Sequence, residues 1–290
     1  MPEETKQNRF LLLLLAFFAL LAILFSAGNF KFKEIIRLEG ARMEKIAREL
    51  TDLELETRAM QVYDLSENKK LFGVNDDVAM PIASLVKSMT VTLALNTLGE
   101  EKIVYISSSA VKQLGDYGLK VGETWRAGEL AKFTLLASAN DGAYALAESA
   151  GLDVLNKMNE KARKIGMENT FFLNVTGLDQ IENDIPIAAG GFASASDLNA
   201  LAHYALRAYP EIFRATTLPE INGFKNTNPI VGEIPNLLFS KTGFTDLAGG
   251  NLSIIFRNGR SNLIAITLLG STYEGRFADM EKIVNVLYSL

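Results

Sequence analysis

Ser84 and Lys87 have the types and the spacing for acyl-transfer chemistry. They lie in the run Met80-Pro81-Ile82-Ala83-Ser84-Leu85-Val86-Lys87. Pro81 suits the first position of a helix, because its ring fixes φ and its missing N–H is not needed there. We therefore predict a helix from Pro81 that carries Ser84 in its first turn, where free backbone N–H groups can hold a negatively charged oxygen. Lys87 would follow one turn later on the same face. A hydroxyl, an amine and free N–H donors are the parts of a serine acyl-transfer site.

The Ser-x-x-Lys spacing is not specific by itself. It also occurs at Ser66 and at Ser109, in polar stretches, and a serine in a first helical turn is often only a cap. The chain has a single histidine, His203, in an apolar-periodic run where packing is the commoner role. A Ser-His-Asp triad would have to use that histidine. If Ser84 acts as a nucleophile, the better candidate for its base is Lys87.

Composition narrows the function classes. The chain has 290 residues, 48% of them hydrophobic, so it can bury a sizeable core in one large domain or two modest ones. The net charge of −5 shows no excess of basic residues, which argues against nucleic acid as a partner. Cysteine is absent, which excludes disulfides, thiolate metal sites and cysteine nucleophiles.

The N-terminal region contains an unbroken apolar run over residues 10–25. A bilayer core needs about 20 residues of helix, and this run nearly reaches that length. We expect a short tail over 1–9, a transmembrane anchor over 10–28, a charged stalk helix over 29–56 and one folded domain over 57–290. The alternative is a signal peptide that is cleaved near Ser26-Ala27-Gly28, which would leave a secreted protein.

Periodicity in the remaining chain predicts an α+β domain. Alternating residues indicate a strand pair over 58–74, followed by a helix to Leu98 and by mostly helical sequence to about residue 209. A long loop interrupts that helical part at 174–191. Strands follow at 237–242, 251–256 and 263–269, with a hairpin signal at Asn258-Gly259, and a last helix covers 277–290. We expect an antiparallel sheet built from both chain ends and packed against the helical middle.

Two further polar motifs could complete a site around Ser84. Ser138-Ala139-Asn140 falls in the break between the predicted helices 128–137 and 141–150, where both polar residues could simply be caps. Lys241-Thr242-Gly243 ends a predicted strand, and its glycine would let a ligand backbone lie close. Each motif alone is commonplace.

Together and in this order, the three motifs resemble those of the penicillin-binding proteins and class A β-lactamases. The wider match is most similar to the low-molecular-mass serine D-Ala-D-Ala carboxypeptidases. It includes the segment Gly177-Leu178-Asp179 and covers about residues 57–290. The resemblance implies the β-lactamase/transpeptidase-like fold, with 57–290 as the DD-peptidase domain.

The resemblance also implies a role for each motif residue. Ser84 would form an acyl-enzyme, Lys87 would be its general base, Ser138 would relay a proton to the leaving amine and Asn140 would hold the substrate amide. Burial and a nearby positive charge from Lys241 would keep the base neutral. Lys241 is expected among the catalytic residues and, with Thr242, would bind the terminal carboxylate of the substrate. The backbone N–H groups of Ser84 and Phe244 would hold the oxyanion. The expected substrate-binding residues are Thr242, Gly243, Phe244 and Arg276, with an exposed surface position as the alternative for the arginine.

The implied reaction removes the terminal D-Ala from peptidoglycan stem peptides outside the cytoplasmic membrane, without a metal or organic cofactor. β-Lactam antibiotics would act as covalent inhibitors. The alternatives are a DD-endopeptidase, a β-lactamase, for which 151–191 offers no Glu-x-x-Leu-Asn segment, and a catalytically silent wall-binding protein. Two residues depart from the family pattern. Phe244 stands where histidine or tyrosine is common, and Ser196 stands where an arginine usually precedes Asp197.

Overall fold

The computed structural model describes residues 34, 37–115 and 117–289. The chain divides into two compact units, one ending at Glu49 and one comprising Leu50–Leu290. Residues 37–51 are helical, in agreement with the helix predicted within 29–56. The anchor predicted over 10–28 lies outside the described residues, and the helices within the described ranges are too short or too polar to cross a bilayer.

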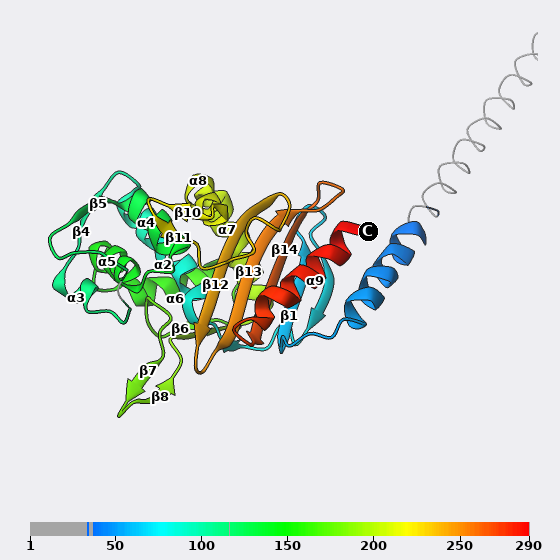
Figure 1. The fold of residues 1–290 in the computed structure, drawn as a ribbon, viewed down its shortest axis with the longest axis horizontal. Coiled ribbons are helices and arrows are strands. Elements are labelled where there is room, and N and C mark those ends of the chain that lie inside the picture. Colours follow the sequence, from blue (N-terminus) through cyan, green and yellow to red (C-terminus); the bar gives the residue numbers. More distant parts are fainter. Residues whose placement is uncertain (1–33, 35–36, 116, 290) are drawn as a thin grey trace, which may run out of the picture. The chain divides into compact units, whose positions relative to one another are not determined.

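The larger unit contains a five-stranded antiparallel sheet made from both ends of the chain (Figure 1). Its strands run in the order β12 (Leu237–Thr245), β13 (Gly249–Arg257), β14 (Leu263–Ser271), β1 (Ala59–Asp64) and β2 (Lys69–Val74). The two ends meet where β1 pairs with β14, with Val62 opposite Ile266. The predicted sheet contributed by both termini is thereby confirmed.

Helices cover both faces of this sheet (Figure 1). Helix α7 (Ala195–Ala208) packs on β1, β13 and β14, and α9 (Gly275–Ser289) packs on β13 and β14. This double cover explains why β13 and β14 are buried along nearly their whole length. The hairpin predicted at Asn258-Gly259 joins these two strands, and in its connection over 258–262 the Asn258 N–H donates to the carbonyl of Asn262.

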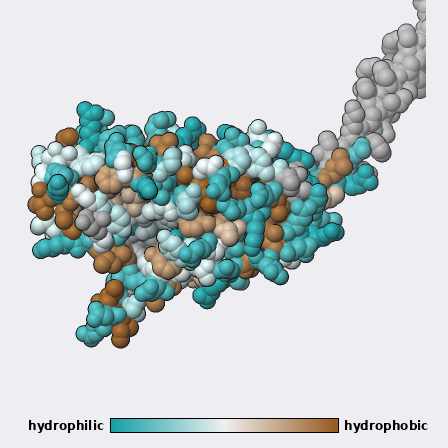
Figure 2. All heavy atoms as spheres, viewed as in Figure 1, coloured by the Kyte–Doolittle hydropathy of each residue, from teal (hydrophilic) through white to brown (hydrophobic). Residues whose placement is uncertain are grey.

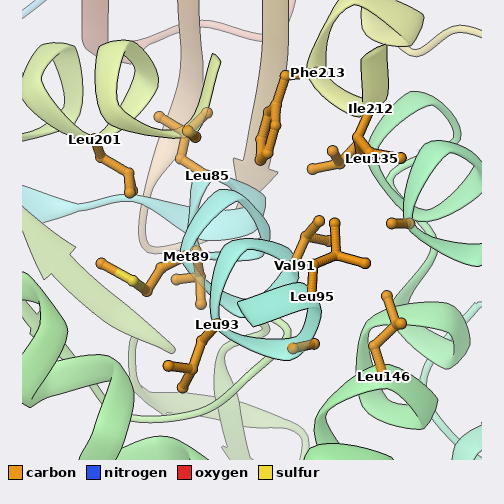
Figure 3. Packing of buried hydrophobic residues seen from close by; sticks show 14 of the residues in the cluster. Leu85, Met89, Val91, Leu93, Leu95, Leu135, Leu146, Leu201, Ile212 and Phe213 are labelled. Carbon is orange, nitrogen blue, oxygen red and sulfur yellow. The ribbon is translucent and has the colours of Figure 1, made fainter. Parts of the chain in front are cut away.

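Helix α2 (Val86–Leu98) is the centre of the helical region. It packs against α4 (Ala127–Leu136), α5 (Asn140–Ala150), α6 (Val154–Lys164) and α7. Figure 3 shows buried side chains of neighbouring helices around it, among them Leu135 of α4, Leu146 of α5, Leu201 of α7 and Ile212 of α8 (Pro210–Arg214). Residues Val86–Leu95 are all buried. The run Thr90-Val91-Thr92 has low helix propensity, so burial, at about 1.5–3 kcal/mol for a side chain such as Val91, stabilises it as helix.

Pro81 does not begin this helix, so that prediction is wrong. Pro81 belongs to the short strand β3 (Met80–Pro81), which pairs with β9 (Gly191–Ala193), and the Ile82 N–H donates to the carbonyl of Gly191. A 3₁₀ turn, η1 (Ala83–Leu85), then leads into α2 at Val86. Ser84 therefore lies in a tight turn between a strand and a helix.

The segment predicted as a loop over 174–191 contains a hairpin, so that prediction is wrong in part. Strands β7 (Gln180–Glu182) and β8 (Ile185–Ala188) are joined by Asn183 and Asp184, both at positive φ, as a two-residue hairpin turn requires. The hairpin projects from the body of the unit (Figure 1), and Figure 2 shows apolar atoms on it. Its three isoleucines, 181, 185 and 187, are each more than half exposed.

The remaining elements are short and connect these parts. They are β4 (Ile103–Tyr105), α3 (Ser108–Val111), β5 (Thr124–Arg126), β6 (Phe171–Phe172), η2 (Ala215–Thr217), β10 (Glu220–Ile221) and β11 (Phe224–Lys225).

Candidate active site

Ser84 and Lys87 form a hydrogen-bonded pair where η1 meets α2. The Lys87 Nζ lies 2.7 Å from the Ser84 Oγ. The lysine side chain is fully buried, whereas Ser84 is half-buried. Burial lowers the pKa of Lys87 to about 7, against the opposing charge of Asp141, which raises it. At neutral pH a large fraction of this amine is therefore unprotonated and able to accept a proton from the serine hydroxyl.

Two glycines from distant segments, Gly177 and Gly243, allow their backbones to pack closely against the turn that carries Ser84. A Cβ at Gly177 would lie 2.0 Å from the carbonyl oxygen of Ala83, and one at Gly243 would lie 3.3 Å from the Ser84 nitrogen. Ala83 itself has φ +47°, a left-handed conformation that costs about 1–2 kcal/mol for an L-residue. The strained turn that carries Ser84 persists because β12 and the 174–179 segment pack against it.

A second hydroxyl–amine pair joins the other two sequence motifs. The Lys241 Nζ, on β12, lies 2.8 Å from the Ser138 Oγ and also donates to the carbonyl of Thr242. Ser138 has φ +58° in the break between α4 and α5. Burial, followed by the positive charges of Lys87 and Arg276, lowers the pKa of Lys241 well below its usual value. The two pairs are therefore close enough to interact electrostatically.

Asn140 begins α5 with its side chain buried next to these pairs. Its Nδ2 donates to the carbonyl of Leu114 at 2.8 Å, while its Oδ1 is buried with no hydrogen-bond partner in the described part of the chain. Leaving a buried acceptor unsatisfied costs about 1–3 kcal/mol. This oxygen can therefore accept a hydrogen bond from a ligand N–H.

Arg276 contacts the end of β12, the strand whose Lys241 bonds to Ser138. Arg276, on α9, is 3% exposed, so the surface alternative for this arginine is wrong. Its Nη1 donates to the carbonyl of Gly243 at 2.6 Å, and its guanidinium lies 5.8 Å from the ring centre of Phe244, which is half exposed. The Thr242 Oγ1 lies 2.6 Å from the Thr227 Oγ1. A carboxylate beside this strand would meet buried cations and hydroxyl groups.

The structure places the sequence-predicted residues from all three motifs together and leaves His203 outside. His203 is half-buried on α7, where it lines a surface groove with Tyr204 and Arg207. Burial and the charge of Arg207 lower its pKa. The departure at Ser196 also has a structural account. The Ser196 hydroxyl donates to Asp77, and the neighbouring Asp197 accepts from the Asn169 N–H and the Thr170 hydroxyl.

Sequence reasoning missed three contributors to the site. The carbonyl of Thr176 accepts from the Lys87 Nζ at 2.6 Å, the hydroxyl of Thr227 contacts Thr242, and the charge of Asp141 acts on Lys87. The run Asn174-Val175-Thr176-Gly177 has the composition of an Asx-type turn, which was the available signal for the first of them. The other two have no local signature.

Comparisons with known proteins identify relatives of this chain among D-alanyl-D-alanine peptidases. A family model described as D-alanyl-D-alanine carboxypeptidase, peptidase S11, matches residues 44–272. The chain is 28% identical over 257 residues to the D-alanyl-D-alanine carboxypeptidase DacF of Bacillus subtilis, an alignment covering 82% of this chain and 64% of that protein. It is 30% identical over 236 residues to a D-alanyl-D-alanine endopeptidase of Pseudomonas aeruginosa, covering 75% and 73%.

A solved structure shows the same similarity in three dimensions. The structure of penicillin-binding protein D2 from Listeria monocytogenes in its cefotaxime-bound form superposes with a TM-score of 0.69 at 30% identity, covering 82% of this chain and 99% of that one. The family model matches most of the chain, and both a relative and a solved structure reach 30% identity. The chain therefore belongs to the peptidase S11 family, the D-alanyl-D-alanine carboxypeptidases.

Proposed function

We propose that this protein is a serine-type D-alanyl-D-alanine carboxypeptidase that removes the terminal D-Ala from peptidoglycan stem peptides. The observation that carries the proposal is the fully buried Lys87 amine, 2.7 Å from the Ser84 hydroxyl, with a pKa of about 7. Membership of the peptidase S11 family and the similarity to DacF support the same reaction.

In the proposed acylation step, the Ser84 Oγ attacks the carbonyl carbon of the last peptide bond as its proton passes to the Lys87 Nζ. The developing oxyanion would be held by the backbone N–H groups of Ser84 and Phe244. Collapse of the tetrahedral intermediate breaks the C–N bond, and the leaving amine takes a proton through Ser138. D-Ala departs, and water then hydrolyses the Ser84 ester.

Substrate binding in this proposal uses the end of β12. The carboxylate of the terminal D-Ala would be bound by Lys241 and Thr242, with Arg276 supporting the strand at Gly243. Gly243 lies close to the Ser84 nitrogen, so a substrate held at the end of β12 would lie beside the nucleophile. The free Oδ1 of Asn140 would accept from a substrate amide N–H.

Inhibition by β-lactams follows from the same chemistry. A β-lactam carries a strained amide and a carboxylate, so Ser84 would open the ring and remain acylated. The similar Listeria monocytogenes protein has been solved in cefotaxime-bound and ampicillin-bound forms, which supports this expectation. The domain over 57–290 would act outside the cytoplasmic membrane, attached through residues 10–28.

A DD-endopeptidase is the second candidate. Relatives from Pseudomonas aeruginosa and Haemophilus influenzae that are 30% identical to this chain are D-alanyl-D-alanine endopeptidases. The chemistry at Ser84 would be unchanged: a D-Ala would supply the carbonyl that Ser84 attacks, and the leaving group would be the amine of the neighbouring stem peptide to which that D-Ala is cross-linked. The two activities differ only in the substrate that reaches the site.

The test measures D-Ala release from a stem pentapeptide and cleavage of a cross-linked dimer by the purified protein. We expect D-Ala release that Ser84→Ala abolishes and that Ser109→Ala, a matched change in another Ser-x-x-Lys sequence, leaves intact. Cleavage of the dimer alone would favour the endopeptidase. Release of neither product would contradict both, and rapid penicillin turnover without peptide cleavage would indicate a β-lactamase.

A further inference from the structure

The Lys87 amine has a second fixed partner besides Ser84. The backbone carbonyl of Thr176 lies 2.6 Å from the Lys87 Nζ. A carbonyl oxygen can only accept, so one N–H of the amine must point toward Thr176. A neutral amine has two N–H bonds and one lone pair, and fixing one N–H stops rotation about the Cε–Nζ bond. The lone pair can then face the Ser84 hydroxyl.

The carbonyl of Thr176 is held in turn by the side chain of Asn174. The Asn174 Oδ1 accepts from the Thr176 N–H at 3.1 Å and from the Gly177 N–H at 2.7 Å, and it also lies 3.2 Å from the Thr176 Oγ1. Its Nδ2 donates to the carbonyl of Leu178 at 2.8 Å. These bonds fix the peptide unit between Thr176 and Gly177, whose oxygen meets Lys87.

We propose that Asn174 is a positioning residue for acylation, which aims the Lys87 lone pair at Ser84 through the carbonyl of Thr176. The inference rests on the proposed function of Ser84 and Lys87. Asp141 on α5 and Lys241 on β12 are the described charges that interact with Lys87, and substituting Asn174 leaves both in place. Removing the Asn174 amide therefore changes the direction of the amine more than the charge around it.

Asn159 provides a matched control within the same region. On α6, its Oδ1 accepts from the Phe172 N–H at 2.8 Å, and its Nδ2 donates to the carbonyls of Phe172 and Leu155. Asn159 thus fixes the backbone at Phe172, shortly before Asn174, with buried hydrogen bonds. Among the described residues, none of its hydrogen-bond partners bonds to Lys87. Each lost bond costs about 1 kcal/mol in either variant, so the two alanine substitutions should lower thermal stability comparably.

The experiment measures the acylation rate constant and the non-covalent affinity for a fluorescent penicillin from pH 5.5 to 9. The full chain is compared with Asn174→Ala, Asn174→Asp and Asn159→Ala. We expect Asn174→Ala to lower the alkaline plateau of the acylation rate constant by about 10- to 100-fold, with little change in the affinity for penicillin. A small misplacement of the reacting groups has an effect of this size on rate. Asn159→Ala should stay within about threefold of the wild type.

Asn174→Asp gives a readout that a purely structural role would not move. Aspartate keeps an acceptor for the N–H groups of Thr176 and Gly177 but loses the N–H that donates to the Leu178 carbonyl, so the alkaline plateau should fall, by less than in Asn174→Ala. Its added negative charge near Lys87 should move the acid limb of the profile to higher pH. This variant decides the matter if Asn174→Ala does not fold.

Either of two results would overturn the inference. One is an Asn174→Ala plateau within threefold of the wild type, and the other is an equal loss of rate in Asn159→Ala. A wild-type protein that takes up no penicillin and releases no D-Ala would refute the proposed function itself, and this inference with it. Normal wild-type acylation with no effect of either Asn174 variant would refute the positioning role alone.

Discussion

The low pKa of Lys87 makes the pH dependence of acylation a demanding prediction. Burial moves this pKa from 10.5 to about 7. About half of the Lys87 side chains are then neutral at pH 7, compared with roughly one in three thousand for an ordinary lysine. The difference corresponds to about 5 kcal/mol in favour of the neutral base. Because only the neutral amine accepts a proton, acylation must become slower as the pH falls below 7.

The assay is the second-order rate constant for labelling by a fluorescent penicillin between pH 5 and 9, with circular dichroism at each pH as a check of folding. We expect an acid limb centred near pH 7, a tenfold fall per pH unit below about pH 6, and a plateau above about pH 8. The charge of Asp141 raises the pKa of Lys87, so Asp141→Asn should move the limb to lower pH. Because the charge of Lys87 acts on Lys241, the two lysines titrate together, and the midpoint of the acid limb reports the pair and not Lys87 alone.

Three results would refute this reasoning. A rate that is flat from pH 5 to 8 would mean that no group titrating near neutrality acts as the base. A rate that still rises tenfold per pH unit up to pH 9 would mean that Lys87 keeps an ordinary pKa. A limb that disappears in His203→Gln would assign the base to the histidine, although that side chain lines a groove apart from Ser84.

The other predictions concern stability, backbone space and carboxylate binding. The folded pKa of Lys87 lies below its unfolded value. The cost of burying its charge is therefore fully present below about pH 7 and falls as pH rises toward 10.5. Lys87→Met should therefore have a higher free energy of unfolding than the wild type in urea titrations. This gain should shrink by about 1.4 kcal/mol per pH unit between pH 7 and 10, and a gain that grows with pH would contradict the low pKa. Gly177→Ala should lower penicillin labelling at least tenfold, because the new Cβ would lie 2.0 Å from the carbonyl oxygen of Ala83. Gly166 also has a positive φ but lies in open space, so Gly166→Ala should cost only about 1–2 kcal/mol of stability. Equal labelling of the two alanine variants would contradict the steric argument. Arg276→Ala should lower kcat/KM for D-Ala release by about 10- to 100-fold, because the charge-assisted hydrogen bond to the Gly243 carbonyl is lost. Arg257→Ala, at the far end of the sheet, should leave kcat/KM unchanged. An unchanged kcat/KM in Arg276→Ala would show that Arg276 does not contribute to the site.

The sheet was predictable because its signals are local. The strands over 237–245, 249–257 and 263–271 follow apolar runs that the sequence shows directly, and their pairing with the N-terminal strands follows from a helical middle between two β-rich ends. The start of α2 was not predictable in the same way. Pro81 fits an edge strand as well as a first helical turn, and the deciding contact, with β9, comes from more than a hundred residues away.

The candidate site shows the same division. Ser84, Lys87, Ser138, Asn140 and Lys241 could be named because side chains of these types in this order resemble a known family, and the structure places them together. The carbonyls of Thr176 and Leu114 could not be named, because any residue has a carbonyl and only the tertiary fold aims it. The burial of Arg276 likewise depends on α9 packing against the sheet.

The most direct test of the account is to locate the covalent adduct of a β-lactam on the intact protein. Incubation with penicillin, followed by intact-mass measurement and peptide mapping, should find one adduct per chain on the peptide that contains Ser84. Ser84→Ala should carry none. An adduct on Ser66, Ser109 or any other residue, or a wild-type protein that remains unmodified, would contradict the assignment of Ser84 as the nucleophile.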